Sequence, residues 1–350
     1  MNRKKFIKSL TAVTIGSTVL SPLSFSKSLV PDDSPLVKAP RLKSGDKLGL
    51  VTPGSYISEE ELQESIKNLN DLGFDVTYSK DVLLQTGYFA GTDEERAKDL
   101  MDKFTDKSVK GIVCARGGYG CSRILPLLNY NLIRSHPKVL IGYSDVTALL
   151  YGIYQQAGLI TFHGPVGIST FNEYSVDNFK KVLIDPERTE TFKNSNSGSD
   201  ENTYGVTTIV EGKSKGRFIG GNLSIMVSLI GTRYDVSYSR KIIFIEEVGE
   251  ESYRIDRMLT QLIESGKFKH ASGIMMGIFK DCEVKEKNPS FEKSFTLMEV
   301  LKDKLSNLKI PVIYGMSFGH VNDKFTIPFG ALAELNTSDQ TFMLLEKAVK

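Results

Sequence analysis

The hydrophobic and polar positions of the N-terminal half alternate between two patterns. Short apolar runs typical of buried strands occupy residues 47–52, 74–78, 111–115, 139–141 and 159–162. Between the earlier runs, apolar residues recur at helical spacing from residue 58 to 72 and from 92 to 104. The first of these segments opens with Ser58 and Glu61, a pairing typical of a helix N-terminus. Strands that alternate with helices in this way predict a doubly wound, mostly parallel α/β sheet.

The pattern changes beyond this first unit. Residues 171–205 are mainly polar, and we interpret them as an exposed linker. From residue 206 a second set of apolar segments begins, with strand-like runs and helical patterns at 223–231, 241–245, 252–263, 273–279 and 311–314. The sequence therefore predicts two α/β domains, at residues 42–170 and 206–345, with the active site at their junction.

The first 26 residues have the pattern of a targeting segment. Basic residues open it, a modestly apolar stretch follows, and the small residues Ser24 and Ser26 fit a cleavage site. The run from Arg3 to Lys8 resembles a twin-arginine export signal with lysine in place of the second arginine, which leaves the export route open. We therefore expect an exported, periplasmic protein with no stable membrane insertion after processing. The alternative is an uncleaved anchor, which the short apolar run disfavours.

The charge balance argues against a nucleic-acid partner. The chain has 350 residues, of which 44 are Lys or Arg and 42 are Asp or Glu, for a formal net charge of +2. The targeting segment contains four of the basic residues and no acidic residue, so the rest of the chain has 40 basic and 42 acidic residues. Such a balance offers no broad basic surface for a phosphate backbone.

Cysteine and histidine are too few and too scattered to predict a metal site or a disulfide framework. Of the three cysteines we expect Cys114 to pack in the core, although a bridge between Cys114 and Cys121 after export is an open alternative. The four histidines have no HxxxH or CxxC partners; they are His136, His163, His270 and His320. We expect neither a zinc site nor a cofactor.

The segment at residues 138–154 is the first candidate for chemistry. An apolar run ends at Gly142, and Ser144 falls in the turn that starts the next helix. Such a turn lifts a serine hydroxyl out of the sheet and leaves backbone N–H groups facing its target, as in a nucleophile elbow. The alternative is that Ser144 or Asp145 only caps the helix, since Val146 stands where G-x-S-x-G has its second glycine.

A glycine-rich turn at residues 116–120 follows the strand at 111–115. Its backbone N–H groups can approach a ligand closely, but it lacks the lysine of a phosphate-binding P-loop. This turn and Ser144 both follow parallel strands, so both should lie at the carboxyl edge of the sheet. We interpret the turn as an oxyanion hole rather than as a nucleotide site.

A serine nucleophile needs a base, and the base needs a carboxylate that orients it. Glu246 follows the apolar strand at 241–245, and His320 lies in a glycine-flanked segment. Both are placed where a rigid element gives way to a loop, as site residues often are. The alternatives are an ordinary surface histidine and solvated carboxylates, and we expect Glu247 and Glu250 to be solvated.

Five motifs resemble those of the LD-carboxypeptidase family of serine peptidases, which includes the microcin C immunity peptidases. They are R-G-G-Y-G at 116–120, G-Y-S-D-V-T at 142–147, G-G-N-L-S at 220–224, I-F-I-E-E-V-G-E-x-x-Y-R-I-D-R-M-L at 243–259 and F-G-H-V-N-D-K-F-T-I-P-F-G at 318–330. The resemblance covers about residues 42–345. It implies Ser144 as the nucleophile, His320 as the base and Glu246 as the orienting carboxylate. The implied oxyanion hole consists of the backbone amides of Gly117, Gly118 and Asp145.

The resemblance also implies a reaction, the hydrolysis of the amide bond to a terminal D-amino acid in a murein tetrapeptide through an acyl-enzyme. The immunity branch cleaves aminoacyl-nucleotide or related amides, and the absence of tryptophan slightly disfavours it. An exported muropeptide-binding protein is the non-enzymatic alternative. The family further implies a homodimer. Candidate residues for binding the substrate are Arg116, Asn222, Arg254 and Arg257.

Overall fold

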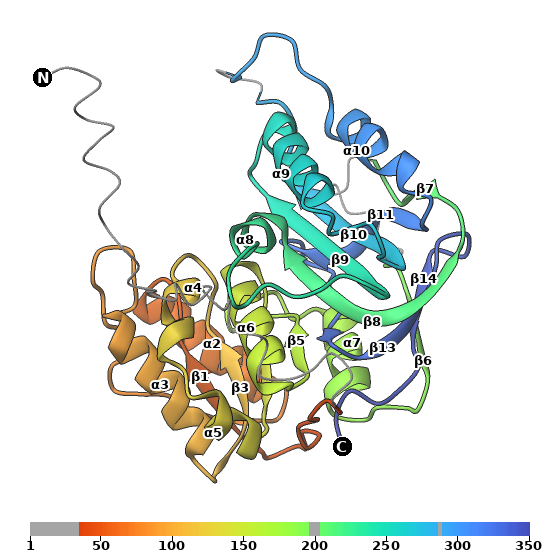
Figure 1. The fold of residues 1–350 in the computed structure, drawn as a ribbon. Helices are drawn as coiled ribbons and strands as arrows, with labels where there is room; N and C mark the ends of the chain where they lie inside the picture. Colours follow the sequence, from red (N-terminus) through yellow and green to blue (C-terminus); the bar gives the residue numbers. More distant parts are fainter. Residues whose placement is uncertain (1–34, 196–203, 286–288) are drawn as a thin grey trace, which may run out of the picture.

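The computed structural model describes residues 35–195, 204–285 and 289–350. The expected targeting segment, residues 1–26, lies outside these ranges. The described chain forms two α/β units that pack side by side, each built on its own sheet (Figure 1). The N-terminal sheet is mostly parallel and the C-terminal sheet is mixed, so the predicted fold class is confirmed. In the described ranges, no helix combines the length and the apolar character needed to cross a membrane.

The N-terminal sheet has six strands in the order β12-β5-β4-β3-β1-β2. One of them, β12 (Ile327–Phe329), comes from near the end of the chain and runs antiparallel to its neighbour β5. The segment just after His320 is thereby held against the N-terminal unit. The other five strands are parallel and are β1 (Lys47–Val51), β2 (Asp75–Thr77), β3 (Val109–Cys114), β4 (Val139–Gly142) and β5 (Thr161–His163).

Helices connect the parallel strands. Capping boxes, each a Ser or Thr three residues before a Glu, begin α2 (Glu59–Asp71) and α3 (Asp93–Thr105). The helix that follows the Ser144 turn, α6 (Thr147–Ala157), is buried along almost its whole length, so its start is held rigidly. The shorter helices α4 (Cys121–Ile124) and α5 (Tyr130–Ser135) complete the set up to residue 164.

The stretch expected to be a linker, residues 171–205, differs from that expectation where the structure describes it. It contains α7 (Glu173–Leu183) and β6 (Glu190–Lys193). Asn172 caps the helix by accepting a hydrogen bond from the Ser175 amide, and the apolar face of α7 is buried. The polar composition hides this face because its apolar residues are spaced three to four apart rather than clustered.

The C-terminal sheet has eight strands in the order β6-β14-β13-β8-β9-β10-β11-β7. Its four central strands, β8 to β11, are parallel, and the outer pairings are antiparallel. The strands added here are β7 (Thr207–Val210), β8 (Lys213–Asn222), β9 (Lys241–Val248), β10 (Gly273–Lys280), β11 (Val312–Gly319), β13 (Leu332–Asn336) and β14 (Thr341–Leu344). Two of them, β9 and β11, run further than the apolar patterns predict: the extension of β9 contains Glu246, and that of β11 ends directly before His320.

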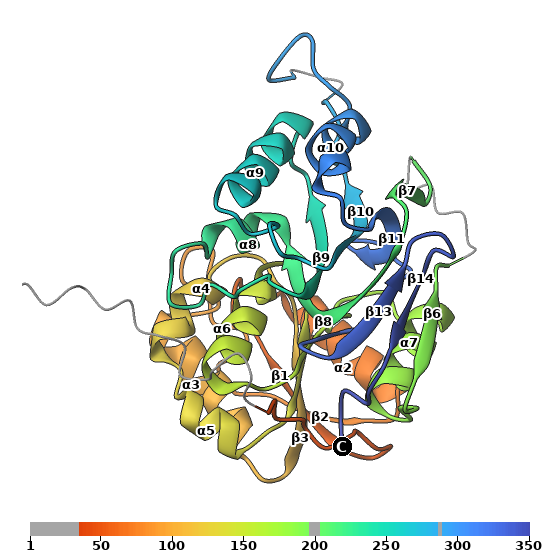
Figure 2. The same cartoon turned by 45° about the vertical axis from the view of Figure 1, so that its right-hand side comes forward.

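Three helices accompany this sheet: α8 (Leu223–Ser228), α9 (Ser252–Glu264) and α10 (Leu297–Leu305). Figure 2 shows α9 and α10 packed side by side over the parallel strands, with α8 below them. Since α8 contacts both α9 and α6, it lies where the two units meet.

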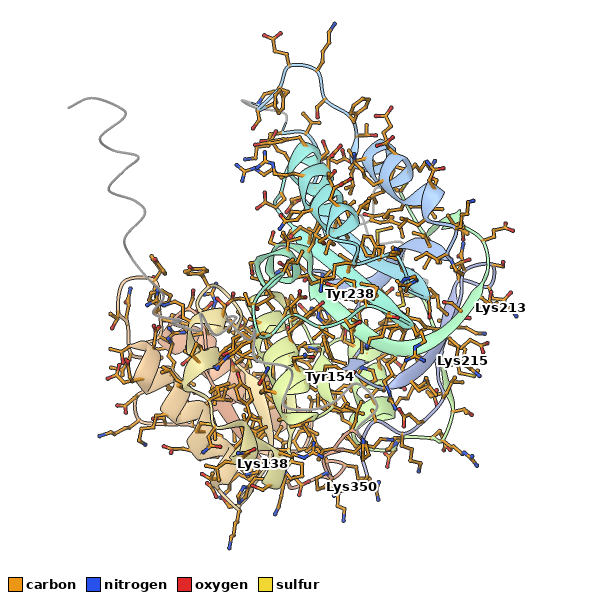
Figure 3. All side chains as sticks on the ribbon, viewed as in Figure 1. Lys138, Tyr154, Lys213, Lys215, Tyr238 and Lys350 are labelled. Carbon is orange, nitrogen blue, oxygen red and sulfur yellow. The ribbon has the colours of Figure 1, made fainter. Side chains whose placement is uncertain are left out.

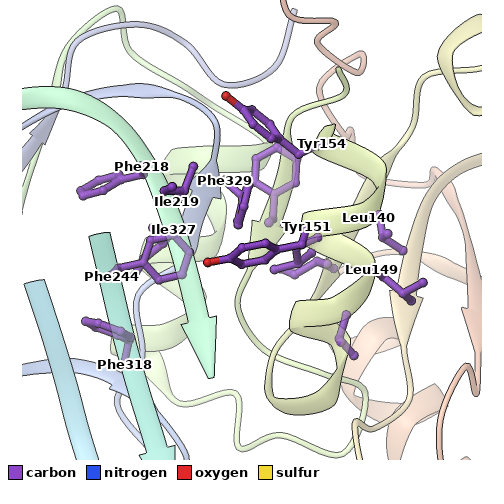
Figure 4. Close-up of a cluster of buried hydrophobic side chains, with 14 of the residues drawn as sticks. Leu140, Leu149, Tyr151, Tyr154, Phe218, Ile219, Phe244, Phe318, Ile327 and Phe329 are labelled. Atoms are coloured by element: carbon purple, nitrogen blue, oxygen red, sulfur yellow. The ribbon is translucent and has the colours of Figure 1, made fainter. Parts of the chain in front are cut away.

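The junction between the units is closed by aromatic packing around α6 (Figure 4). The Tyr151 ring lies 5.1 Å from the Phe329 ring, and the Tyr151 hydroxyl is 3.1 Å from that of Tyr238. Tyr154 and Tyr238 mark this junction in Figure 3, whereas Lys138, directly before β4, lies at the opposite end of the N-terminal unit. The carboxyl end of β4, which carries Ser144, therefore faces the C-terminal unit.

Candidate active site

Ser144 occupies a sharp turn between β4 and α6. Residues 144–146 form a single 3₁₀ turn, and Ser144 has a φ of 65°, in the left-handed region that L-residues seldom adopt. Such strain is typical of a strand-to-helix nucleophile elbow. The Ser144 side chain does not cap α6, so the alternative that it serves only as an N-cap is not supported.

Asp145 ties the elbow to the glycine-rich turn instead of capping α6. Its Oδ2 atom accepts a hydrogen bond of 2.8 Å from the Cys121 amide. Burial raises the pKa of the Asp145 carboxyl, and the hydrogen bonds from Cys121 oppose that shift only in part. The side chain thus holds residues 116–121 against the elbow, while the Asp145 backbone amide remains at the start of the helix.

The glycine-rich turn lies directly against the serine. A methyl group at Gly117 would come within 2.8 Å of Ser144 Cβ, 3.1 Å of Ser144 Oγ and 3.1 Å of the Asp145 amide nitrogen. The next residue, Gly118, has a φ of 84°, which favours glycine. Its amide donates to no other residue in the described part of the chain. The turn and the elbow are therefore close enough for both amides to serve one oxyanion.

Ser55 fixes the shape of this turn. Its amide donates to the Gly117 carbonyl at 3.2 Å, and its hydroxyl accepts from the Tyr119 amide at 3.1 Å. The Gly118 amide lies between these two anchored residues, so its direction is set before any ligand arrives.

His320, directly after β11, and Glu246, on β9, form a largely buried hydrogen-bonded pair. His320 Nδ1 lies 2.8 Å from Glu246 Oε2, and the glutamate is fully buried in β9. Gly319, the last residue of β11, allows this approach, because a methyl group there would lie 3.1 Å from Glu246 Cβ. About a fifth of the His320 side chain is exposed, which leaves the histidine accessible from solvent.

The pKa values of the two residues are shifted in opposite directions, as a base and its orienting carboxylate require. Burial alone would raise the pKa of Glu246, but the charge and hydrogen bond of His320 outweigh it and the pKa is lowered. Burial alone would lower the pKa of His320, and Glu246 outweighs it so that the pKa is raised. Glu246 is therefore ionised, and it stabilises the protonated form of the imidazole.

Two contacts bring this pair to the Ser144 elbow. The Tyr143 ring, next to the serine, packs edge-on against the His320 ring at 4.8 Å. On the other side, the Asn222 amide donates to Thr147 Oγ1 at 3.0 Å, and Asn222 pairs in register with Glu246. The three residues expected to act together thus come from both units and meet at the junction.

Glu247 is not solvated, contrary to expectation. It is buried, and its carboxylate accepts hydrogen bonds from Asn222 Nδ2 at 2.8 Å and from the Ser224 amide at 2.7 Å. The prediction was wrong because β9 does not end at Ile245 but continues to Val248, so both faces of the strand are covered. Glu250 lies beyond the strand, half-buried, with an oxygen 3.4 Å from Arg254 Nε.

The candidate substrate-binding residues occupy different surroundings. Arg116 precedes the glycine-rich turn and pairs with Glu61 at 3.2 Å. Asn222 is buried, and its side chain accepts from the Ile225 amide while it donates to Glu247. The remaining two lie on α9, where both guanidinium groups pack on the Tyr253 ring; they are Arg254 and Arg257.

The structure adds three residues that the sequence pattern did not single out. Tyr143 and Lys324 flank the catalytic histidine candidate, and the Lys324 ammonium lies 5.3 Å from the Tyr143 ring centre. His163, at the end of β5, is buried nearby. An isolated histidine in a strand has no sequence signal that separates core packing from a role in a site, so only the fold identifies it.

Metal and disulfide chemistry find no support in the described ranges. These residues contain no group of three or more His, Cys, Asp or Glu side chains placed to hold a metal ion. All three cysteines are buried and free, and burial raises the pKa of each thiol. The open alternative of a Cys114–Cys121 bridge is therefore not what this structure contains.

Comparisons with known proteins agree with this architecture. Models of the LD-carboxypeptidase N-terminal domain and C-terminal domain match residues 48–164 and 215–335. A probable murein peptide carboxypeptidase of Bacillus subtilis is 36% identical over 312 residues, which cover 88% of this chain and 94% of that protein. The microcin C7 self-immunity protein MccF of Escherichia coli is 28% identical over 341 residues, which cover 89% of this chain and 96% of that protein.

Solved structures resemble the chain over most of its length. The apo form of MccF superposes with a TM-score of 0.82 at 26% identity and covers 90% of this chain and 100% of that structure. A muramoyltetrapeptide carboxypeptidase from Oxalobacter formigenes superposes with a TM-score of 0.72 at 28% identity, and the match covers 85% of this chain and 97% of that structure.

Proposed function

The chain belongs to the LD-carboxypeptidase family of serine hydrolases, and from this premise we propose that it removes the terminal D-amino acid from murein tetrapeptides. We assign Ser144 as its nucleophile, His320 as its base and Glu246 as the carboxylate that orients the base. One observation carries the assignment. The buried 2.8 Å pair of His320 and Glu246 packs, through Tyr143, against the strained turn of Ser144.

The first half of the reaction forms the acyl-enzyme. His320 takes the proton of the Ser144 hydroxyl while the oxygen bonds to the carbonyl carbon, whose π electrons move onto the carbonyl oxygen. The amides of Gly118 and Asp145 stabilise that oxyanion. As it collapses, the C–N bond breaks, and His320 gives its proton to the departing amine of the D-amino acid.

The second half repeats these steps with water. His320 takes a proton from the water as its oxygen bonds to the ester carbon, and returns a proton to Ser144 as the ester C–O bond breaks. Glu246 stays ionised throughout and stabilises the imidazolium that forms twice in each cycle.

A carboxypeptidase must also recognise the terminal carboxylate. Of the candidate arginines we propose Arg116, because it directly precedes the turn that packs on Ser144. Its planar guanidinium suits a carboxylate. The arginines of α9 are engaged with Tyr253, which fits a structural role.

A second candidate function is supported by the fold. The TM-score to MccF, 0.82, exceeds that to the Oxalobacter carboxypeptidase, 0.72, and MccF has been solved in complex with aspartyl sulfamoyl adenosine. An immunity-type peptidase that cleaves aminoacyl-nucleotide amides is therefore the alternative. The non-enzymatic alternative, a muropeptide-binding protein, is disfavoured by membership of a hydrolase family.

We further propose that the enzyme acts outside the cytoplasmic membrane as a homodimer. Export is supported by the pattern of residues 1–26, and dimerisation by the resemblance to the family. Fractionation of expressing cells and light scattering of the purified protein test the two proposals separately. Activity confined to the cytoplasm, or a monomer at micromolar concentration, would contradict them.

The deciding experiment offers both substrates to the full chain. The protein is incubated with a murein tetrapeptide or with aspartyl sulfamoyl adenosine, and the released amino acid is identified by chiral mass spectrometry. We expect free D-alanine from the tetrapeptide and none with Ser144→Ala. Release of aspartate alone would reject the carboxypeptidase assignment in favour of the immunity-type alternative.

A further inference from the structure

His163 lies behind the proposed triad, in a place that core packing alone does not explain. It is the last residue of β5 and is 1% exposed. In the parallel pairing of β4 and β5 it stands opposite Gly142, two residues before Ser144. It is therefore a buried polar residue on the N-terminal sheet, at the level of the elbow.

Ring contacts show which surface His163 faces. Its ring lies 5.3 Å from that of Phe244 and 5.9 Å from that of Phe318. Phe244 precedes Glu246 by two positions on β9, so the two side chains share a face of that strand. Phe318 precedes His320 by two positions. His163 thus faces the ion pair from across the junction of the two units.

Tyr143 lies between the two histidines. Its ring packs on His163 at 6.0 Å and on His320 at 4.8 Å, and so touches both histidines. The charged and titratable groups around the pair come from separate segments of the chain and are Tyr143, His163, Glu247, Cys282 and Lys324.

Among the buried polar atoms that have no hydrogen-bond partner in the described residues, two belong to His163 and to the glutamate of the pair. They are Nδ1 of His163 and Oε1 of Glu246, the oxygen that does not contact His320. Buried polar atoms are nearly always paired, directly or through an ordered water, so each calls for an explanation. Their chemistry is complementary, because an ionised carboxylate can only accept and a neutral imidazole can donate one N–H.

We propose that His163 is a positioning residue for the triad: its Nδ1–H serves Glu246 Oε1 through one bridging water. The hydrogen bond keeps Glu246 ionised and its other oxygen directed at His320. Burial supports the neutral form that this role requires, since it lowers the pKa of His163 to about 4, against the opposing charge of Glu246. In this role His163 acts on the reaction only through Glu246. This inference rests on the proposed function of the Ser144, His320 and Glu246 set.

Two substitutions separate this role from packing. Phenylalanine keeps a ring among Phe244 and Phe318 but donates nothing. Asparagine carries its amide nitrogen near the place of Nδ1 and can donate again. His136→Phe is the matched control, since His136 is a partly exposed histidine two residues before Lys138, which lies at the end of the N-terminal unit opposite the junction.

The expected results are a loss and a rescue. His163→Phe should lower kcat about 10- to 100-fold, the range for one hydrogen bond to a charged group, with KM within about twofold. His163→Asn should stay within about fivefold of wild type. A destabilised Glu246 anion supports the imidazolium less, so the acid limb of the pH profile should move to lower pH in His163→Phe by about half a unit or more.

Two readouts keep the inference separate from the substrate assignment. One is tetrapeptide hydrolysis; the other is the rate at which a fluorophosphonate probe labels Ser144, which needs no peptide. If the tetrapeptide is inert but the probe reacts, the proposed function fails, and the labelling rates of the three variants still test His163. Equal rates and equal pH profiles for wild type and His163→Phe would overturn the inference. So would equal losses in His163→Phe and His163→Asn, with or without a lower melting temperature.

Discussion

At the scale of single residues, burial gives ordinary side chains unusual properties. Glu246 and His320 have shifted pKa values because β9 and the end of β11 place their side chains 2.8 Å apart, with the glutamate inaccessible to solvent. A serine becomes a candidate nucleophile because the turn after β4 gives it a φ of 65°. The roles proposed for these residues therefore follow from their positions in the fold rather than from their residue types.

The pH dependence follows from the raised pKa of His320. A base must be unprotonated, so kcat/KM should fall as the pH drops through that pKa, with its acid midpoint above the ordinary histidine value of 6.5. Glu246→Gln removes the partner that raises the pKa, and burial then lowers it, so the midpoint should move below 6.5. We expect kcat to fall about 10³- to 10⁴-fold. The exposed Glu264→Gln on α9 is the control, and an unmoved midpoint in Glu246→Gln would refute the pairing.

Recognition of the terminal carboxylate belongs to the same scale. Arg116→Ala should raise KM for the tetrapeptide about tenfold or more, with a smaller change in kcat, because it removes a charge-assisted hydrogen bond to the substrate. For a substrate with an amidated C-terminus, Arg116→Ala and wild type should have similar KM values, because that substrate has no terminal carboxylate to bind. Arg254→Ala is the comparison, and a larger effect there would place the carboxylate at α9 instead.

At the scale of elements, the elbow and the glycine-rich turn work as one unit. The Asp145 carboxylate holds the Cys121 amide, and Ser55 holds Gly117 and Tyr119, so the two loops are fixed relative to each other. The proposed oxyanion site therefore depends on the close contact of Gly117 with Ser144. A loop moved by a few tenths of an ångström would misdirect the amides.

Gly117→Ala tests this contact. The added methyl group would lie 2.8 Å from Ser144 Cβ and must push the turn away from the elbow. We expect kcat to fall at least about 100-fold while the protein remains folded. Gly266→Ala, where a methyl group meets open space, should cost only about 1 kcal/mol of stability for its positive φ and leave kcat unchanged. Normal turnover by Gly117→Ala would remove this turn from the oxyanion site.

Local signals in the sequence predict the elements well. The first strands and helices, the cap at Ser58 and the elbow after Gly142 all follow from patterns within about fifteen residues, and the structure has them. Contacts between distant segments have no such signal. β12 joins the N-terminal sheet, Glu247 is buried by Asn222 and α8, and His163 faces Glu246 only after the units pack. The resemblance to a family supplied the triad, which spacing alone left open.

At the scale of the whole molecule, the proposed site is formed where the two units meet. Ser144 belongs to one sheet and Glu246 and His320 to the other, so their alignment depends on the junction. α6 anchors it through Thr147 and Tyr151, and β12 adds a strand from the C-terminal half to the N-terminal sheet. In this account the junction thus affects both stability and the geometry of the proposed triad.

Thr147→Val probes this coupling. Valine keeps the volume of threonine but leaves the buried Asn222 amide without its acceptor, which should cost about 1–3 kcal/mol in unfolding free energy. Because Asn222 pairs with Glu246, we expect kcat to fall more than KM rises. Denaturant titration and steady-state kinetics measure the two effects. Thr260→Val on α9, which loses only a local bond to Asp256, should change neither by much.

The most direct test of the central claim is to find which residue carries the covalent bond. The full chain is treated with a fluorophosphonate, digested, and analysed by peptide mass spectrometry, beside His320→Ala. The triad predicts a single modification on Ser144, formed at least about 100-fold more slowly in His320→Ala. Modification of another serine, or an equal rate in the variant, would contradict the assignment of Ser144 and His320.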